Sequence, residues 1–282
     1  MNRLLGKVAI ITGGTRGIGL ALAEAFAVEG AAVVVGSRSL ESVKSAVSLL
    51  GAKGYQVRGY QMDVSSIDQV QALADHAIRE LGHFDIWVNN AGVAGPYGPT
   101  MDIDLKTFQQ VLQTNILGVY YGSHVAMRHF LSQRQGKLIN LLGHGAKGPV
   151  PFQNAYSSSK AWVRSFTRSL AQETKGSGVG VFAFSPGMVL TDLLTDVEVI
   201  QGSEHRLKNF GVILRMWAKP PEVVTEKAIW LASSATDGQT GLEIYLQSTG
   251  MMLRGALREG IRSLLRRPVR PIDIKLKVIP PA

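Results

Sequence analysis

Tyr156 and Lys160 are the residues whose types and spacing point most directly to chemistry. They stand four positions apart, so on a helix they share one face and can act on the same bound molecule. A free phenol titrates at about pH 10, and a nearby ammonium favours the phenolate and lowers that pKa. The pair can therefore exchange a proton with a substrate near neutral pH. The alternative interpretation is a tyrosine and a lysine on a solvated helix face.

A glycine-rich turn near the N-terminus is the second such feature. Residues 12–19 read Thr-Gly-Gly-Thr-Arg-Gly-Ile-Gly, between a β-branched run at 7–11 and a helix-forming run at 20–26. Its spaced glycines let the turn close tightly and let backbone N–H groups approach a phosphate at a helix N-terminus. A plain tight turn is the alternative. We expect these residues to contact a dinucleotide: Gly13, Thr15, Arg16, Gly17, Ile18 and Gly19.

The end of the second predicted strand bears on which dinucleotide binds. Arg38 follows the strand at 31–36, and the segment 30–40 contains no Asp or Glu. An acidic residue here would bond the ribose 2′-hydroxyl of NAD, whereas an arginine accommodates the 2′-phosphate of NADP. Arg38 and Arg16 both suit bidentate phosphate contacts. We therefore favour NADP(H) as cofactor, with NAD(H) and two ordinary surface arginines as the alternative.

The elements that must position these groups alternate between strand-like and helix-like segments. This alternation predicts an α/β protein whose parallel sheet is covered on both faces. The predicted strands are 7–12, 31–36, 55–61, 84–89, 137–142, 179–184 and 242–246. The predicted helices are 17–29, 39–51, 66–81, 104–132, 155–175 and 221–233.

Polar and small residues end the third and fourth strands. Asp63, followed by Val64, can accept a hydrogen bond from an adenine amino group, or it can belong to a helix N-cap before Ser66. The run Asn89-Asn90-Ala91-Gly92 can hold its strand end beside a cofactor, or it can be ordinary turn chemistry. The candidate cofactor contacts here are Asp63, Val64, Asn89, Ala91 and Gly92.

In order and spacing, these motifs resemble the classical short-chain dehydrogenase/reductase (SDR) family over about residues 4–250. The matching positions are Thr12-Gly13-x-x-x-Gly17-x-Gly19, Asn89-Asn90-Ala91-Gly92, Asn115, Tyr156-x-x-x-Lys160 and Pro186-Gly187-x-x-x-Thr191. The resemblance implies a single-domain Rossmann fold with a doubly wound seven-stranded parallel sheet. It also implies a nicotinamide cofactor, carbonyl/alcohol chemistry without a metal, and a homodimer or homotetramer joined through helices 104–132 and 155–175.

The resemblance also implies roles for individual residues. Tyr156 is the acid/base, Lys160 binds the ribose and lowers the tyrosine pKa, and Asn115 helps to hold a water that links Lys160 to solvent. The nicotinamide side of the site is implied to consist of Pro186, Gly187, Val189 and Thr191.

One position departs from the family pattern. The family places a serine thirteen residues before the tyrosine, but this chain has Gly143 there and no Ser or Thr from 137 to 155. Losing one donor to a developing oxyanion typically costs about 2.7–4 kcal/mol. We predict that His144 replaces the serine, with Asn154, a water or a merely solvated histidine as alternatives.

The sequence thus predicts an NADPH-dependent oxidoreductase with Tyr156 as acid/base. The alternative is a catalytically weakened NADPH-binding sensor or scaffold protein, although retention of the tyrosine, lysine and asparagine favours an enzyme. Apolar residues in the loops that border the pocket favour a bulky apolar carbonyl or alcohol substrate, with core or subunit contacts as the alternative. They are Val93, Pro96, Tyr97, Phe152, Met188, Leu190, Leu193, Leu194, Phe210, Ile213, Leu214, Met216 and Trp217.

Composition narrows the remaining classes. The chain has 282 residues, 45% hydrophobic content and no cysteine, which excludes disulfides, thiolate nucleophiles and cysteine-bound metals. It has no run of about 18 apolar residues that would span a membrane. The N-terminus leads directly into the first strand, so we expect no signal peptide and a cytoplasmic location.

We divide the chain into a catalytic domain at 1–253 and a basic C-terminal extension at 254–282. The extension has eight basic and two acidic residues, a net charge of +6 out of +9. Arginines recur every four residues from Arg254 to Arg266, beside leucines, which predicts an amphipathic helix. We expect its apolar side to dock on the protein body or on a partner subunit, with an anionic membrane surface as the alternative. Nucleic-acid binding is not expected.

Overall fold

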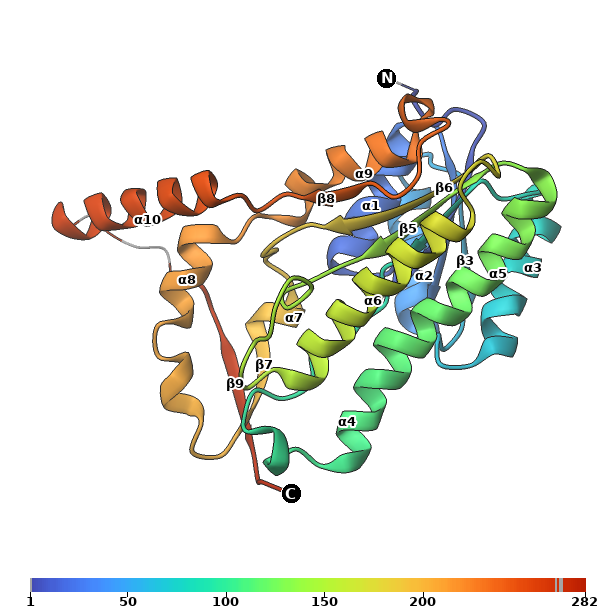
Figure 1. Cartoon of the computed structure of the whole chain (residues 1–282). Coiled ribbons are helices and arrows are strands. Elements are labelled where there is room, and N and C mark those ends of the chain that lie inside the picture. The colour runs from blue at the N-terminus through green and yellow to red at the C-terminus, as the bar shows by residue number, and fades with distance from the viewer. Residues whose placement is uncertain (1, 267, 269–270) are drawn as a thin grey trace.

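The computed structural model describes residues 2–266, 268 and 271–282, and its main feature is a parallel sheet (Figure 1). Within these residues the sheet has seven strands in the order β3-β2-β1-β4-β5-β6-β8. The strands are β1 (Val8–Thr12), β2 (Ala32–Ser37), β3 (Val57–Gln61), β4 (Ile86–Asn89), β5 (Gly136–Leu141), β6 (Val179–Ser185) and β8 (Glu243–Tyr245). This confirms the predicted single-domain Rossmann fold and all seven predicted strands, with bounds shifted by a few residues.

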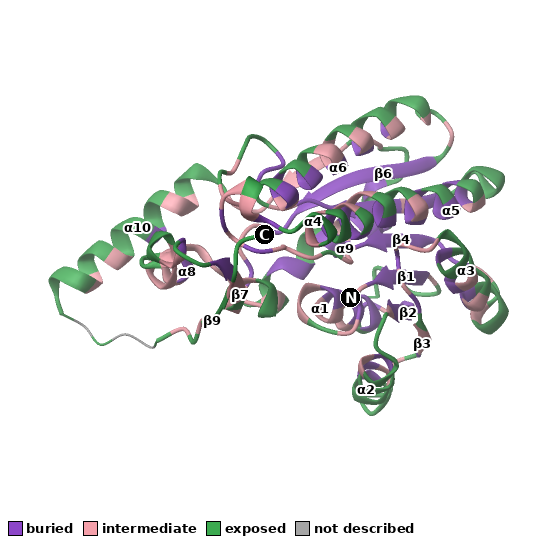
Figure 2. Cartoon of the chain, turned by 90° about the horizontal axis from the view of Figure 1, so that it is seen from below, coloured by how far each residue is buried: buried purple, intermediate pink, exposed green. Residues whose placement is uncertain are grey.

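Helices cover both faces of this sheet (Figure 2). Every residue of β1 and β6 is buried, as expected for parallel strands packed on two sides. One face carries a core around Phe26 and Leu50 under α1, α2 and α9, and the other a core around Trp87 and Phe130 under α3, α5 and α6. The helices are α1 (Gly17–Val28), α2 (Leu40–Gly51), α3 (Ile67–Leu81), α4 (Leu105–Leu112), α5 (Gly118–Gln133), α6 (Asn154–Glu173), α7 (Asp192–Thr195), α8 (Phe210–Trp217), α9 (Thr225–Ala232) and α10 (Thr249–Leu264).

The predicted helix at 104–132 is interrupted, which corrects the expectation of one continuous element. A π-helical turn, Gln113–Leu117, separates α4 from α5. Such wide turns inside helices often occur at functional sites. The predicted helix at 221–233 likewise begins as a 3-10 turn, Pro221–Val224, before α9.

A small second sheet lies outside the predicted elements. Strand β7 (Asp196–Ile200) pairs in parallel with β9 (Lys275–Ile279), with Val199 opposite Val278. The Ala282 N–H then donates to the Asp102 carbonyl at 3.0 Å. Both strands alternate polar and apolar residues, which is the signal that would have predicted them. The C-terminal extension therefore returns to the catalytic body.

The helix of the extension is present, but its apolar side is exposed and does not dock on the protein body, which corrects that part of the prediction. Docking on a partner subunit stays a prediction. α10 begins at Thr249, before the predicted boundary at 254, and Ser248 caps it by accepting from the Met251 N–H. It projects beside α8 (Figure 1), and its leucines are exposed. Residues 267 and 269–270 of the extension lie outside the described residues. No helix in the described ranges is long and apolar enough to cross a membrane.

Candidate active site

The predicted site residues gather at the carboxyl ends of β1 and β4. These strands are neighbours, but the chain runs from β1 towards β2 and from β4 towards β5 on the opposite side. Ligands of open α/β sheets bind in the crevice at such a reversal. Asn90 joins the two ends, because its Nδ2 donates to the carbonyls of Thr12 at 2.9 Å and Gly13 at 3.0 Å. Thr12 Oγ1 in turn accepts the Asn90 N–H at 3.1 Å. Sequence reasoning named neither residue as a contact.

The glycine turn has the shape that a phosphate needs. Gly13 and Gly17 have φ of 64° and 53°, which favour glycine, and a Cβ on Gly19 would lie 2.1 Å from the Gly13 carbonyl oxygen. α1 starts at Gly17 with no acidic residue in its first turn, and no side chain among the described residues caps it. Its first N–H groups are therefore open to an anion. Thr15 and Ile18 are half-buried in this turn. The turn fits a dinucleotide pyrophosphate.

The two arginines differ in their surroundings. Arg38 is exposed after β2, and its carbonyl accepts from Gln61 Nε2 at 3.0 Å. Arg16 forms an exposed ion pair with Asp192, with Nη1 and Oδ2 3.0 Å apart. This pair joins the glycine turn to the segment after β6.

Asp63 and Asn89 have local bonds that bear on their predicted roles. Asp63 Oδ1 accepts from the Ser65 N–H at 2.9 Å and from Ser65 Oγ at 2.8 Å, and Ser66 caps α3. That oxygen belongs to the turn, while the adjacent Val64 is buried. Asn89 is buried, donates to Asn140 Oδ1 at 2.8 Å and accepts from Trp87 Nε1 at 2.8 Å. Its side chain therefore links β4 to β5 inside the core, and contact of Asn89 with a cofactor stays a prediction.

Asn115 lies fully buried in the π-helical turn. Its Oδ1 accepts from the Val93 N–H at 2.9 Å, and its Nδ2 donates to the Val93 carbonyl and to Ser159 Oγ. A Cβ on Gly92 would lie 3.3 Å from Asn115 Oδ1 and 3.7 Å from Lys160 Nζ. The turn thus brings Asn115 and the lysine to the same strand end. Sequence reasoning missed Ser159, whose position on α6 three residues after Tyr156 was the available signal.

Lys160 is buried and donates from Nζ to the Leu141 carbonyl at 3.1 Å. Burial penalises its charged form and lowers its pKa to about 8. Burial also raises the pKa of Tyr156 to about 12, because a phenolate is poorly solvated there. Lys160 Nζ lies 5.7 Å from the centre of the Tyr156 ring. Desolvation is the cause of the raised tyrosine pKa, so this geometry does not show the predicted lowering by the ammonium.

Gly143 and the Tyr156 hydroxyl occupy the same small volume. A Cβ on Gly143 would lie 2.2 Å from that hydroxyl oxygen and 3.3 Å from Lys160 Cγ. The hydroxyl therefore fills the space into which a side chain at 143 would project. A side chain at position 143 would therefore require this hydroxyl to move.

The predicted replacements for the missing serine lie at the surface. His144 is exposed on the loop after β5. Asn154 is also exposed, and its Nδ2 donates to Thr100 Oγ1 at 3.3 Å. Neither side chain hydrogen-bonds to Tyr156 within the described part of the chain.

The segment after β6 borders the same crevice. Gly187 has φ of 77°. Two backbone hydrogen bonds hold the segment to Lys219. The Leu190 N–H donates to the Lys219 carbonyl at 2.8 Å, and the Lys219 N–H donates to the Met188 carbonyl at 3.0 Å. This ladder uses the groups on either side of Val189 and leaves the Val189 N–H outside it. A Cβ on Gly17 would lie 3.0 Å from Thr191 Cγ2, so Thr191 packs on the glycine turn.

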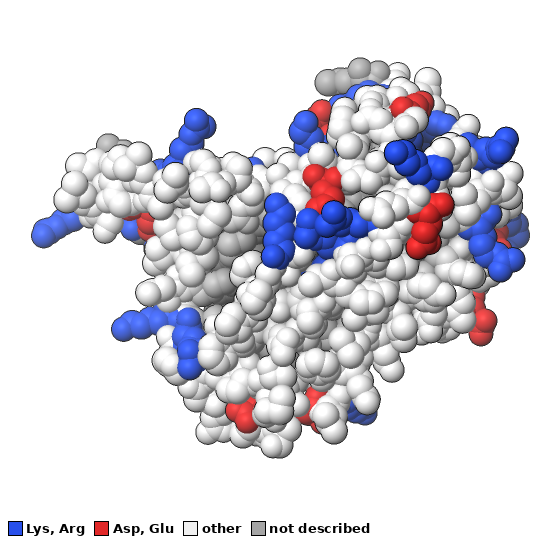
Figure 3. Space-filling view, in the orientation of Figure 1, with Lys and Arg blue, Asp and Glu red and all other residues white. Residues whose placement is uncertain are grey.

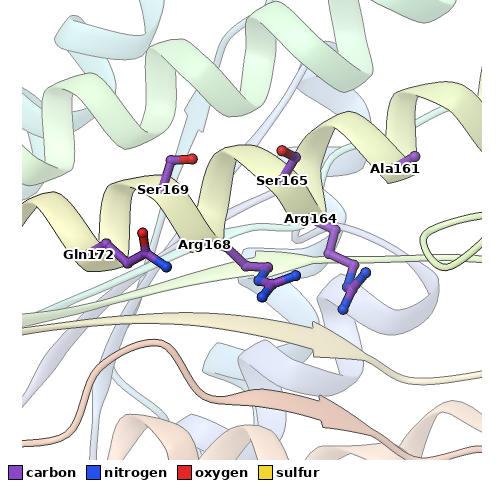
Figure 4. A pocket seen from close by; sticks show the side chains of 6 residues that line it. All are labelled: Ala161, Arg164, Ser165, Arg168, Ser169 and Gln172. Carbon is purple, nitrogen blue, oxygen red and sulfur yellow. The ribbon is translucent and has the colours of Figure 1, made fainter.

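A separate hollow on α6 does not belong to this site. Figure 4 shows two arginines pointing to one side of the helix and two serines to the other. Arg164 Nε lies 2.8 Å from Glu243 Oε2, so this surface is partly neutralised. The lining residues are Ala161, Arg164, Ser165, Arg168, Ser169 and Gln172.

Comparisons with known proteins agree with this geometry. Residues 7–199 match the family model described as short chain dehydrogenase. The chain is 34% identical over 252 residues to 3beta-hydroxysteroid dehydrogenase 1 of Eggerthella lenta, covering 89% of this chain and 95% of that protein. It is 35% identical over 243 residues to an Oryza sativa subsp. japonica protein named "Probable chlorophyll(ide) b reductase", covering 78% of this chain and 46% of that protein.

Among solved structures, the chain resembles a gluconate 5-dehydrogenase from Burkholderia cenocepacia in complex with NADP and tartrate. The TM-score is 0.77 at 26% identity, covering 87% of this chain and 95% of that one. The similarity therefore extends over the whole sheet and its helices.

Proposed function

The chain belongs to the short-chain dehydrogenase/reductase family of oxidoreductases, which act on alcohols and carbonyls, and from this premise we propose that it is an NADPH-dependent reductase with Tyr156 as acid/base. The observation that carries the proposal is the placement of Tyr156, Lys160 and Asn115 near the glycine turn, at the carboxyl ends of the central strands. We infer a bulky apolar substrate from the loop residues, and the steroid and chlorophyll(ide) names of two relatives support it. The gluconate name of the structural relative does not.

The residues that would hold NADPH fit its parts. The open N–H groups of α1 suit the pyrophosphate, Arg38 and Arg16 suit a 2′-phosphate, and the Val189 N–H suits a carboxamide. Bound NADPH would supply the hydride. Engagement of Arg16 by a phosphate would compete with its ion pair to Asp192.

The high pKa of Tyr156 favours reduction. With a pKa of about 12 the phenol is protonated at neutral pH and is ready to donate. An alkoxide is a stronger base than a phenolate, so the proton passes from Tyr156 to the product oxygen. Lys160, with a pKa of about 8, is mainly an ammonium at pH 7 and stabilises the phenolate that remains.

Loss of NADPH absorbance with a panel of apolar ketones and aldehydes tests the activity. We expect Tyr156→Phe to reduce turnover by roughly 10²- to 10⁴-fold, while NADPH affinity measured by calorimetry stays unchanged. Tyr120→Phe, on an exposed tyrosine of α5, is the matched control. Equal turnover of Tyr156→Phe and the native protein would contradict the proposal.

Cofactor preference has its own test. We expect Arg38→Ala to raise the KM for NADPH by roughly 10- to 100-fold, because a hydrogen bond to a charged group contributes about 1.5–3 kcal/mol. The KM for NADH should hardly change. Arg128→Ala, an exposed arginine on α5, is the control.

A second function, NADPH binding without turnover, is favoured by one observation. Gly143 supplies no hydroxyl to the substrate oxygen, and the Tyr156 hydroxyl fills the space a serine would need. A sensor or scaffold protein should bind NADPH tightly and reduce no ketone. His144 is our proposed replacement donor in the enzyme, and an unchanged rate for His144→Ala would remove it.

We also propose a homodimer or homotetramer, a cytoplasmic location, and a catalytic domain at 1–253 with a distinct extension. Apolar side chains on the outer helices support oligomerisation, since Trp162 and Phe166 stack at 4.8 Å and Tyr120 is partly exposed beside them. Val111 and Val163 are buried in the chain itself and do not contribute. Light scattering measures the mass directly.

A further inference from the structure

One side of α10 carries an exposed apolar stripe, formed by Leu253, Leu257, Ile261 and Leu264. Their spacing of four, four and three residues places them on one side of the helix. Their exposed fractions are 67%, 65%, 48% and 82%. We propose that this leucine stripe binds the surface of an anionic membrane.

The opposite side of α10 is already used by the protein. Gly255 is buried, and a Cβ there would lie 2.4 Å from the Met216 carbonyl oxygen of α8. Trp217 Nε1 donates to the Met252 carbonyl at 3.0 Å, and Arg215 pairs with Glu259 at 3.1 Å. An ordinary surface helix turns its apolar side inwards and its polar side to water. α10 does the reverse, so burial of the stripe requires a surface outside this chain.

The basic side chains of α10 indicate that this outside surface is anionic. Arg254, Arg258 and Arg262 each follow a stripe residue by one position on the helix. Arg254 and Arg258 are exposed, although Arg258 Nη2 also donates to the Arg215 carbonyl at 2.8 Å, so basic side chains lie between the stripe and the body side. Glu259 lies on the body side, between Arg215 and Arg262. An apolar side bordered by arginines is the arrangement that helices use at anionic lipid surfaces. The surface in Figure 3 shows basic side chains on the projecting end and little acidic surface.

A second copy of the chain is a poorer partner for the same reason. It would bring a net charge of +9 and an identical row of arginines to the contact. Like charges placed together oppose association. α10 also projects from the body, so its far end lies away from the sheet and the helices that cover it (Figure 1).

Sedimentation with vesicles tests the proposal on the full chain. We expect binding to phosphatidylcholine vesicles that contain phosphatidylserine, and weak binding to phosphatidylcholine alone. The triple variant Leu253→Ser, Leu257→Ser, Leu264→Ser should bind the anionic vesicles roughly 100-fold more weakly, because three apolar side chains no longer enter the interface. Salt at about 1 M should also weaken binding by the native chain, because it shortens the Debye length to about 3 Å.

The matched control is a triple serine variant at three exposed apolar residues elsewhere: Leu5, Met101 and Leu105. It should bind vesicles like the native chain, and circular dichroism should show both variants folded. Equal sedimentation of the stripe variant and the native chain would overturn the proposal. So would equal binding to anionic and neutral vesicles. A fall in molecular mass of the stripe variant, with unchanged vesicle binding, would make the stripe a subunit contact instead.

Discussion

Two regions of the molecule place polar and apolar groups in opposite ways. The catalytic edge is the carboxyl ends of β1 and β4 together with Asn115, Tyr156 and Lys160. The C-terminal arm consists of α8, α10, β7 and β9. At the edge, Asn115 and Lys160 point inwards, and each has a hydrogen-bond partner. On the arm, leucines point outwards and have no cover from this chain among the described residues. Buried polar groups are tolerated only when they are paired, and exposed apolar stripes are stable when something else covers them. We propose chemistry for the first region and membrane contact for the second.

The largest expected effect tests whether turnover depends on the ammonium of the buried Lys160. Lys160→Met removes the ammonium at similar length and should reduce turnover by roughly 10²- to 10⁴-fold. The lysine pKa is lowered to about 8, so the ammonium is present below pH 8 and is lost as pH rises through 8. The native reduction rate should therefore fall above pH 8, and the variant rate should not. Lys175→Met, on an exposed lysine beyond α6, is the control.

The next effect tests how tightly the edge is packed. Gly143→Ala and Gly143→Ser each add a Cβ where the Tyr156 hydroxyl lies, 2.2 Å from its oxygen. Displacement of a reacting group by about 1 Å can cost 10²-fold in rate, and we expect a loss of this order in kcat from both. The two variants differ only in the hydroxyl, so their ratio isolates its value as a donor. A serine variant faster than the native enzyme would show that the tyrosine moves at little cost.

A smaller effect tests whether the arm shapes the substrate side. Ending the chain after residue 274 removes β9 and its ladder to β7, which lies between Thr191 and α8. We expect a KM for substrate raised about tenfold, from loss of this ordering, with unchanged NADPH affinity. Lys277→Ala removes only the exposed ion pair to Glu198, which contributes little to stability, and is the matched control. An unchanged KM in the shortened chain would separate the arm from the site.

The smallest effect concerns stability of the body. His129 stacks on Phe84 with ring centres 3.9 Å apart, and its Nε2 is buried without a partner among the described residues. Burial lowers its pKa below the ordinary value of 6.5, so the unfolded chain binds the proton more tightly. The free energy of unfolding, measured in urea titrations, should therefore fall slightly as pH drops below 6.5. His129→Phe should flatten this dependence, whereas unchanged dependence would assign it to other groups.

The sequence predicted the sheet and the convergence of the glycine turn with the tyrosine and lysine. Strand periodicity is strong in buried parallel strands, and the motif spacings follow from helix and turn geometry. The π-helical turn was not predicted, because its amino acids also suit an α-helix and only tertiary contacts to Val93 and Ser159 select it.

Docking of the apolar side of α10 on the protein's own body was predicted wrongly. An amphipathic pattern reports that two sides differ, but not which side meets the protein. Here the side that meets the body contains Gly255, whose lack of a side chain lets the α8 backbone approach. The structural role of Asn89 depends in the same way on a distant partner, Asn140, that spacing cannot reveal.

The shared volume of Gly143 and Tyr156 constrains how this lineage can change. A mutation that brings a hydroxyl to position 143 meets an occupied space, so its benefit depends on which substitutions came before it. Directed evolution that starts from saturation of position 143 alone is expected to find mostly inactive clones. Libraries that first vary the residues packed around Tyr156, and only then vary position 143, are expected to contain more active clones.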